Sequence, residues 1–582
     1  MKFLRNVLAT IVALILFSVI SVIILIGIIS SASKEKVVEL KPNTVLHIDL
    51  SRPIVEIAPD DPFSDLEFFP GNEEVIGLKK LKECIANAAN DDNIKAIYLE
   101  SGIVMTGSAI QKEIREALLQ FKESGKEIIS YSEIFSESGL LMSSVANKLY
   151  MAPEGYIEFN GLSSQIAFFK NTFDKLGVEP IIFRVGDYKS AVEPLIREEM
   201  SDENEKQLTQ LLESVYSVYI NDLSGNLGLD KNKLRNISDS MLVQNANQAL
   251  KYGLVTNVGY KDDVLTYLQE ITGASAINKI NSVSINDYRK TFNTFKSSSN
   301  KIAIVVAEGE ILSGNESEDI QSERFAKIIR KIRLDDKYKA LVLRVNSPGG
   351  SALASDIIWR ELMLTKKVKP VITSMSNMAT SGGYYIAAAS DTILAQPNTI
   401  TGSIGVYGML FNAKEFFNDK LGVTFDGVKT GQYSDFYSIT KPMTEAEKMK
   451  IQKEVENAYQ TFINKVAEGR NLSEDSIKSL ASGRVYTGED ALKIGLVDLM
   501  GNLENAVEIA AKKAGIEDDY KTIYMPEPKN FLEKIMEDSE NKVQAHFINK
   551  EMGIFAPYFR ELNRISKQTG VQARLPFTLE IQ

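Results

Sequence analysis

An internal duplication constrains the fold of this 582-residue chain more than any other feature. The segment DDNIKAIYLESG from Asp91 matches DDKYKALVLRVNSPGG from Asp335, at an offset of 244 residues. QALKYGLVTNVG and DALKIGLVDLMG align Ala249 with Ala491, at an offset of 242. Offsets that stay this close over more than 150 positions indicate two copies of one structural unit.

Each copy alternates short β-branched runs with helical patterns. In the second copy, KIAIVVAEG and KALVLRVN have strand character, and SALASDIIWRELML has helical character. This alternation predicts an α/β fold with parallel sheets and helices outside them. The predicted domains are 1–42 for a cytoplasmic N-terminus and membrane anchor, 43–275 for the first repeat, 276–300 for a linker, 301–515 for the second repeat and 516–582 for a C-terminal extension. The extension has no partner in the first repeat, and its patterns are a helical run at 531–551 and a strand-like TLEIQ end.

The N-terminus has the length and composition of a transmembrane helix. Val7 to Ile29 carries no charge, and such a run spans about 30 Å of hydrocarbon. Lys2 and Arg5 precede it, so the positive-inside rule places the N-terminus in the cytoplasm. We therefore expect a single-pass protein of the cytoplasmic (inner) membrane, with its catalytic domains on the outer, periplasmic side. The alternative is a signal peptide cleaved near 31–33, although its apolar core would exceed the usual length of about 7–15 residues.

Composition excludes several classes of function. The net charge of −11 argues against a nucleic-acid partner, since such binding relies on clustered Lys and Arg. Two histidines, His47 and His546, weigh against a Ser-His-Asp site. The single cysteine, Cys84, lies in a helical pattern and is expected to be a buried apolar residue. Nitrogen and sulfur ligands are so scarce that we expect no metal site, and we predict no cofactor.

Two glycine turns in the second repeat have the form of an oxyanion hole. Ser347-Pro348-Gly349-Gly350 follows a strand-like run and opens a helix, where backbone N–H groups favour negative charge. Ser381-Gly382-Gly383 repeats this arrangement on the next strand. Together the N–H groups of Gly382 and of the Gly349-Gly350 turn could bind an oxyanion beside Ser381 as nucleophile. The alternative is two ordinary glycine turns with a serine cap.

A serine nucleophile needs a base, and the duplication indicates Lys189. The repeats align Lys189 with Ser434, whereas the SPGG turn aligns with the glycine-poorer VMTG segment at 104–107. The first repeat thus has the lysine with a degraded turn, and the second has the turn without the lysine. One composite site between the repeats explains both losses. As a base, Lys189 must be neutral, so burial between the repeats must lower its pKa from about 10.4. The alternative is a solvated surface lysine.

Four motifs resemble the signal peptide peptidase A (protease IV) family in its long, duplicated form. They are YKSAVEP at 188–194, NSPGGS at 346–351, SGGYY at 381–385 and TGSIG at 401–405. The resemblance implies two tandem Clp/crotonase-like domains and a Ser/Lys dyad, with Ser381 as nucleophile and Lys189 as general base. It further implies that Ser403 orients the lysine, and that Gly382, Gly349 and Gly350 donate to the oxyanion.

The resemblance also implies a biological setting. Members of this family form a homotetramer against the membrane and cleave remnant signal peptides after their release from preproteins. Short forms have one repeat per chain and borrow the lysine from a neighbour, so fusion of two repeats makes the site intramolecular.

We therefore expect a membrane-anchored serine endopeptidase whose apolar cleft takes extended peptides, through pairing with a sheet edge. One rival is an acyl-CoA enzyme of the crotonase type, which needs a CoA site and no serine nucleophile. A second rival is a non-enzymatic membrane scaffold. Within the peptidase interpretation, Ser138 of the first repeat is a candidate for a second, weaker nucleophile.

Overall fold

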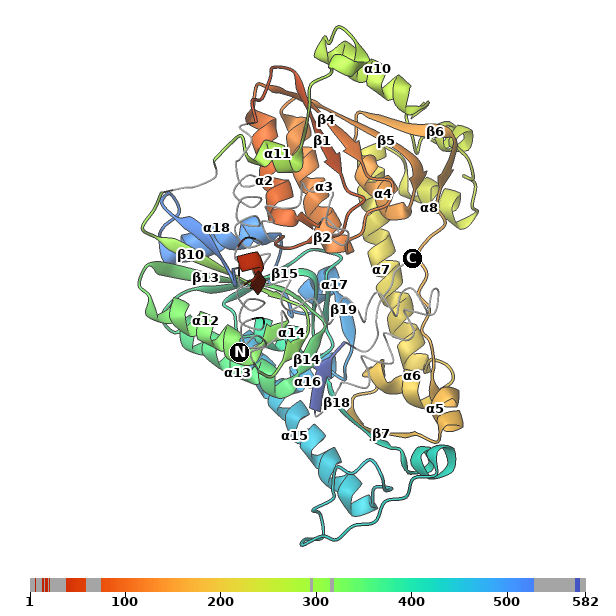
Figure 1. The fold of residues 1–582 in the computed structure, drawn as a ribbon, viewed down its shortest axis with the longest axis vertical. Helices are drawn as coiled ribbons and strands as arrows, with labels where there is room; N and C mark the ends of the chain where they lie inside the picture. The colour runs from red at the N-terminus through yellow and green to blue at the C-terminus, as the bar shows by residue number, and fades with distance from the viewer. Residues whose placement is uncertain are drawn as a thin grey trace.

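Two parallel sheets with the same strand order form the two halves of the molecule (Figure 1). The structure is a computed structural model and describes residues 38–58, 75–293, 297–314, 319–527 and 571–575, together with residues 6, 13, 14, 16–18 and 20. The first sheet runs β8-β6-β5-β4-β1-β9, and the second runs β20-β16-β15-β13-β10-β21. These orders correspond strand by strand, so the predicted duplication is confirmed, and so is the mixed α/β fold.

The strands of these sheets have the following bounds. In the first half they are β1 (Thr44–Asp49), β4 (Ile94–Glu100), β5 (Glu127–Phe135), β6 (Lys148–Ile157), β8 (Asn257–Val258) and β9 (Ser282–Ser284), with β2 (Ile54–Val55) and β3 (Ile76–Gly77) as a separate pair. In the second half they are β10 (Lys301–Glu308), β13 (Tyr338–Ser347), β15 (Val371–Thr380), β16 (Thr392–Ala395), β20 (Leu499–Met500) and β21 (Lys521–Met525), extended by β17 (Ile400–Gly402) and β19 (Val485–Thr487). The edge strands β9 and β21 correspond to each other, and they lie beyond the predicted repeat ends at 275 and 515.

Helices cover the sheets. The helices of the first half are α2 (Leu78–Asn90), α3 (Ser108–Glu123), α4 (Glu137–Ser143), α5 (Lys170–Leu176), η1 (Ser190–Val192), α6 (Glu193–Ile196), α7 (Asp202–Leu227), α8 (Lys231–Asp239), α9 (Ala246–Tyr252), α10 (Lys261–Thr272), η2 (Ile277–Lys279) and α11 (Ile285–Arg289). Those of the second half are α12 (Ser322–Leu334), α13 (Ala352–Lys366), α14 (Gly382–Ala387), η3 (Phe416–Lys420), α15 (Glu445–Arg470), α16 (Glu474–Leu480), α17 (Gly488–Lys493) and α18 (Leu503–Ala514). The predicted strands and helices of the second repeat are therefore confirmed.

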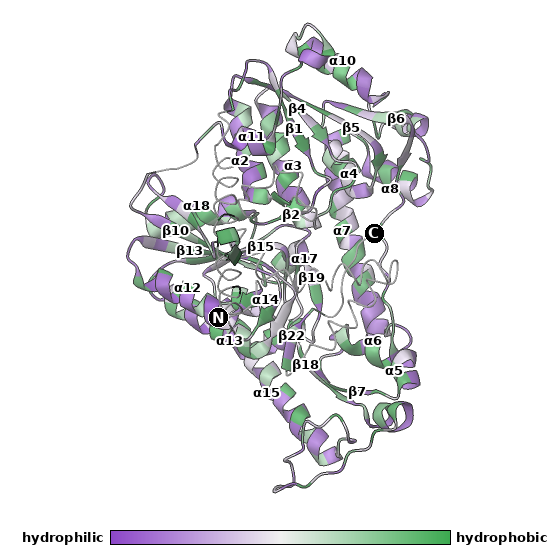
Figure 2. Ribbon diagram, in the orientation of Figure 1, coloured by the Kyte–Doolittle hydropathy of each residue, from purple (hydrophilic) through white to green (hydrophobic). Residues whose placement is uncertain are grey.

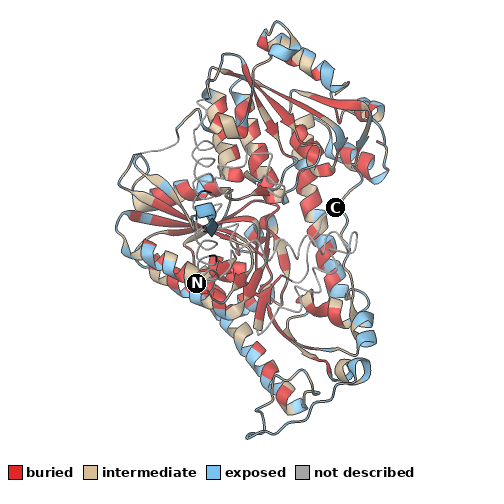
Figure 3. Ribbon diagram, in the orientation of Figure 1, coloured by how far each residue is buried: buried red, intermediate tan, exposed pale blue. Residues whose placement is uncertain are grey.

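Hydrophobic periodicity explains this layering. In α12 the buried Phe325, Ile329 and Ile332 recur at helical spacing and face the sheet. The central strand β13 is instead apolar almost throughout, because helices cover both faces of a parallel sheet. Figures 2 and 3 show the apolar, buried strands inside and the polar, exposed helix faces outside. Cys84 is fully buried in α2, which confirms its predicted apolar role.

A third sheet joins the two halves. Its order is β12-β11-β14-β22-β18-β7, with β7 (Glu179–Val185) from the first half and the other strands from later in the chain. Strand β7 runs antiparallel to β18 (Val406–Asn412), from Val185 opposite Val406 to Glu179 opposite Asn412. The remaining strands are β11 (Ile311–Leu312), β12 (Ile320–Gln321), β14 (Gly349–Ser351) and β22 (Val571–Arg574). Because β7 ends four residues before Lys189, this pairing carries the lysine to the second half.

A buried cation also ties the halves together. Arg344 on β13 is fully buried, and its guanidinium lies 2.7 Å from Glu113 Oε1 and 3.0 Å from Glu56 Oε1, both from the first half. Burial by itself would lower the pKa of Arg344, but the two carboxylates outweigh that effect and hold the pKa above its ordinary value. Lys82 contacts Glu113 at 2.8 Å from the other side. The charges of this interface are therefore paired across the two halves.

We expect Arg344→Met to reduce the free energy of unfolding by about 3–5 kcal/mol, because it leaves the buried Glu56 carboxylate without its cation and Glu113 with Lys82 alone. Urea unfolding measures the change. The matched control is Arg330→Met, since Arg330 is 56% exposed and its partner Glu361 keeps a second contact with Arg333. That control should cost at most about 1 kcal/mol. Equal effects of the two substitutions would contradict a special role for the buried cluster.

Three predicted segments fall largely or wholly outside the described residues. The predicted membrane segment lies mostly outside the described residues, as do the predicted helical run at 531–551 and the strand-like end of the chain. Among the residues that the structure describes, no helix has both the length and the apolar character needed to cross a membrane.

Candidate active site

The loop after β7 brings Lys189 against the second half. The Tyr188 N–H donates to the Ser482 carbonyl at 3.0 Å. Gly483 has a φ of +81°, and a Cβ atom there would lie 2.7 Å from the Lys189 Cβ. Gly186, with a φ of +101°, would similarly bring a Cβ within 2.4 Å of the Ser482 backbone. Glycine at both positions allows the two backbones to approach closely.

Ser381 lies at a strained turn between strand and helix. Strand β15 ends at Thr380 and α14 begins at Gly382, so Ser381 is the residue at the bend. Its φ of 53° and ψ of −110° are rare for a residue with a side chain. Its N–H donates to the Gly402 carbonyl at 2.8 Å, which fixes the turn against the following strand.

The structure places the Lys189 amine within hydrogen-bond distance of both Ser381 and Ser403. Lys189 Nζ lies 2.9 Å from Ser381 Oγ, 3.0 Å from Ser403 Oγ and 3.3 Å from the Ser403 carbonyl oxygen. A neutral amine has two N–H donors and one lone pair. In the structure Nζ is placed to donate to Ser381 Oγ and to both Ser403 oxygens, and the Ser381 hydroxyl donates to the Gly405 carbonyl oxygen at 3.3 Å. If the neutral amine donates to the two Ser403 oxygens, its lone pair is left for the Ser381 proton.

Burial favours the neutral form of this amine. Lys189 and Ser381 are both 0% exposed. Burial lowers the pKa of Lys189 well below its ordinary value of 10.5. A neutral amine beside a serine hydroxyl is the arrangement that general-base activation requires.

A second row of polar groups holds the lysine loop, and the sequence interpretation missed it. Ser190 Oγ donates to Asn204 Oδ1 at 2.9 Å, and Asn204 Nδ2 donates to Glu193 Oε2 at 3.1 Å. Glu193 is fully buried and also accepts from the Ser201 hydroxyl. Ser190 and Glu193 stand inside the YKSAVEP motif, so their polarity there was an available signal. Asn204 lies in the polar start of α7, where nothing in the sequence distinguishes it.

The two predicted oxyanion turns lie side by side. A Cβ atom at Gly349 would lie 2.8 Å from the Gly382 nitrogen, so the turns touch through backbone alone. The N–H of Gly382, the first residue of α14, has no acceptor within its helix. The N–H of Gly349 donates to Ser347 Oγ at 3.2 Å. The structure thus brings the two predicted oxyanion turns into contact, and the Ser347 hydroxyl engages the N–H of Gly349.

The corresponding parts of the first half serve packing. A Cβ atom at Gly107 would lie 2.4 Å from the Asn377 side chain, whose oxygen accepts from the Ile110 N–H at 3.0 Å. Ser138, the candidate second nucleophile, lies within α4, and its hydroxyl pairs with the Ser136 hydroxyl at 3.0 Å. The first-half turn is thus an interface surface.

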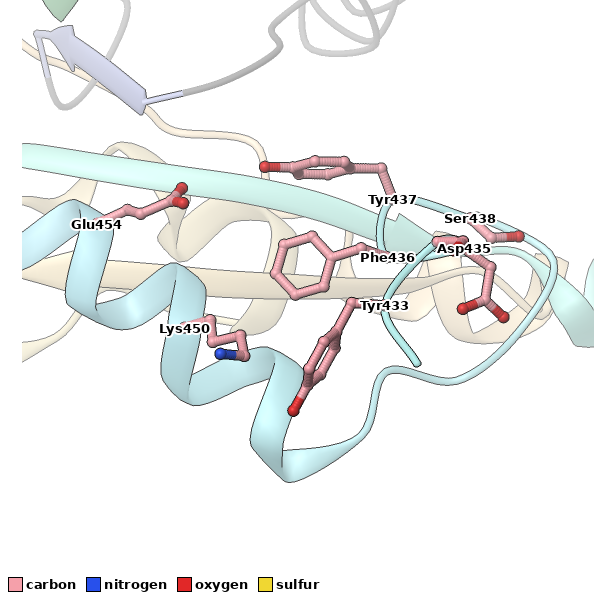
Figure 4. A pocket seen from close by; sticks show the side chains of 8 residues that line it. Tyr433, Asp435, Phe436, Tyr437, Ser438, Lys450 and Glu454 are labelled. Atoms are coloured by element: carbon pink, nitrogen blue, oxygen red, sulfur yellow. The ribbon is translucent and has the colours of Figure 1, made fainter. Parts of the chain in front are cut away.

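A shallow pocket lies on the loop before α15 (Figure 4). Its lining residues are Tyr433, Ser434, Asp435, Phe436, Tyr437, Ser438, Lys450 and Glu454. None of the predicted catalytic residues lines it, and Ser434, with which the repeats align Lys189, is exposed there. Among the described residues, no cluster of three or more His, Cys, Asp or Glu side chains is placed to hold a metal ion.

Comparison with known proteins gives consistent matches. The profile of peptidase family S49 matches residues 120–275 and 363–517. The chloroplastic serine protease SPPA of Arabidopsis thaliana is 33% identical over 514 residues, which cover 86% of this chain and 74% of that protein. Protease 4 of Haemophilus influenzae is 33% identical over 83% of this chain and 82% of its own length. Protease 4 of Salmonella typhi is 34% identical over 80% of this chain and 77% of its own.

Proposed function

The chain belongs to peptidase family S49 and is a serine peptidase, and from that premise we propose that it cleaves peptide bonds with a Ser381/Lys189 dyad. The resemblance drawn from the four motifs is thereby confirmed at the level of the family. The observation that carries the dyad is the 2.9 Å contact between Ser381 Oγ and the fully buried Lys189 Nζ. The lowered pKa of Lys189 supports its role as general base.

In the proposed mechanism, neutral Lys189 takes the proton of Ser381 Oγ as that oxygen attacks the substrate carbonyl carbon. The tetrahedral oxyanion accepts hydrogen bonds from Gly382 N–H and from the Gly349-Gly350 turn. Protonated Lys189 then gives its proton to the leaving amine, and the C–N bond breaks. Water, deprotonated by the same amine, hydrolyses the acyl-enzyme. Ser403 orients Nζ throughout.

The proposal extends to the setting of the enzyme. We propose two Clp/crotonase-like domains behind an N-terminal transmembrane helix, with a C-terminal extension, as a homotetramer on the outer side of the cytoplasmic membrane. The substrates proposed are remnant signal peptides. The uncharged Val7–Ile29 segment and the similarity to the proteins named Protease 4 support this setting.

Covalent labelling tests the proposed nucleophile. We expect a serine-directed fluorophosphonate to add one label per chain at Ser381 after prolonged incubation, as measured by peptide mass spectrometry. Ser138→Ala should retain the label, and Ser381→Ala should lose it. The crotonase and scaffold interpretations instead predict no label at Ser381 in the unsubstituted protein.

A further inference from the structure

Strand β22 occupies a slot between two strands of the third sheet. It pairs antiparallel with β14 on one side, where Gly350 lies opposite Ala573. On its other side it pairs antiparallel with β18, where Tyr407 lies opposite Gln572. Figure 2 labels β22 beside β18. Strands β14 and β18 therefore pair with β22 rather than with each other, and the space between them is one strand wide.

The slot ends at the proposed oxyanion site. The Leu575 N–H donates to the Pro348 carbonyl at 2.7 Å, which continues the ladder into the SPGG turn. A Cβ atom at Gly349 would lie 2.2 Å from the Ala573 carbonyl oxygen, and one at Gly382 would lie 3.1 Å from the same oxygen. The Ala573 carbonyl thus lies against both glycine turns, where the mechanism requires the carbonyl of a substrate.

Side chains hold the strand at two points. Arg574, only 6% exposed, makes an ion pair with Glu310 at 2.5 Å. Leu575, 4% exposed, packs into an apolar cluster. The other buried members of that cluster are Leu208, Leu211, Ile400 and Val485.

We infer that the slot between β14 and β18 is the peptide-binding groove and that β22 occupies it as an intramolecular competitor, so that the chain closes its own active site. This inference rests on the proposed function. An extended peptide binds such a groove by adding a strand, and its main-chain groups pair with the groove edges. Strand β22 already pairs with both edges, so a substrate must displace it. Full burial of Ser381 and Lys189 agrees with a closed site.

The strand is short enough to be displaced. It has four residues, whereas the β7–β18 ladder that joins the halves has seven residue pairs. Only the fraction of molecules with an open groove binds substrate, so the apparent KM rises as that fraction falls. Weakening β22 should therefore lower KM and leave kcat unchanged.

The test is a charge swap in the full-length protein, assayed with a fluorogenic apolar peptide. Arg574→Glu places a second carboxylate beside Glu310 and should raise kcat/KM by at least about tenfold, mainly through KM. The double variant Arg574→Glu with Glu310→Arg restores the ion pair in reverse and should return KM toward that of the unsubstituted protein. Lys453→Glu, an equal charge change at a residue that is 70% exposed, should leave KM unchanged.

Added peptides provide a second readout on Arg574→Glu. A blocked peptide with the sequence of residues 571–575, VQARL, should inhibit it competitively, because Glu310 still accepts the arginine. The same peptide with glutamate in place of arginine should inhibit at least about tenfold more weakly.

Two failures can be told apart. Equal KM values for the unsubstituted protein and Arg574→Glu, with both proteins labelled by fluorophosphonate at Ser381, overturn the intramolecular competitor and leave the dyad standing. Absence of both hydrolysis and labelling in both proteins overturns the dyad itself, and the inference with it. Cleavage of the unsubstituted chain after Ala573 overturns the competitor as well, because the strand is then a substrate.

Discussion

Replacing Ser381 with alanine is expected to reduce kcat for peptide hydrolysis by on the order of 10⁶-fold, the loss typical of removing a covalent nucleophile. The reason is geometric. Ser381 provides the hydroxyl 2.9 Å from a buried amine, and its backbone strain holds that hydroxyl at the bend beside both glycine turns. Initial rates on a fluorogenic peptide, measured at high enzyme concentration, give the residual activity.

The control for this loss is Ser138→Ala, which should keep full activity because the Ser138 hydroxyl pairs with Ser136. Thermal unfolding should show that Ser381→Ala is folded, since the substitution removes one atom from a buried site. A Ser381→Ala protein with more than about 1% of the original kcat would mean that another group performs the attack.

Replacing Lys189 with methionine is the second large effect that we expect. It keeps the length of the side chain but removes the base, and kcat should fall by about 10⁴-fold, the upper end of what one positioned base contributes.

In the unsubstituted enzyme, kcat/KM should rise with pH through the lowered pKa of Lys189 and remain high in the alkaline range, because only the neutral amine accepts the serine proton. A pH profile set by a group near pH 6.5, about the value for histidine, would count against the dyad.

Lys189→Met should raise the free energy of unfolding although it lowers activity. Burial lowers the pKa of Lys189, so between that lowered pKa and the ordinary lysine value the unfolded chain binds a proton that the folded protein does not. The unfolded state therefore binds more protons, and stability rises with pH until the ordinary lysine pKa of 10.5 is reached. Lys189→Met should be more stable than the unsubstituted protein near pH 7, with a difference that shrinks toward pH 10.5. Lys453→Met, at an exposed lysine, should show no such trend in urea unfolding.

The duplicated fold could be predicted because its strands and helices are recognisable from short stretches of sequence. Strands such as β10 and β13 contain dense apolar runs, IAIVVA and ALVL, and the two repeats align without large gaps. The third sheet could not be predicted in this way. Strand β7 pairs with β18, far away in the sequence, and strand β22 reads VQAR, which lacks an apolar run. Apart from the Arg574–Glu310 ion pair and the packing of Leu575, main-chain pairing with β14 and β18 holds β22 in place, and main-chain pairing leaves no hydrophobic pattern in the sequence.

In the candidate active site, too, some features could be predicted from the sequence and others depend on the final packing. Lys189, Ser381 and Ser403 were placed together from the complementary losses of the repeats and the family motifs, and they lie within hydrogen-bond distance in the structure. The sequence did not indicate that Ser347 engages the N–H of Gly349 or that Asn204 braces the lysine loop. Side-chain to backbone contacts of this kind depend on the final packing. Arg344 shows the reverse case, since a charged residue in an apolar run is fully buried only because the other half supplies its carboxylates.

The strand pairing that joins the two halves has a consequence for synthesis. The amine and the hydroxyl of the proposed dyad are 192 residues apart, and β7, which ends four residues before the lysine, finds its partner β18 only after both strands have been translated. At about 5–20 residues per second, the ribosome needs roughly 10–40 s to proceed from one residue to the other. During that interval the nascent chain has a lysine without a nucleophile. A protease built in this way is inert for most of its translation, and its proteolytic activity is postponed until the second half has emerged and folded against the first.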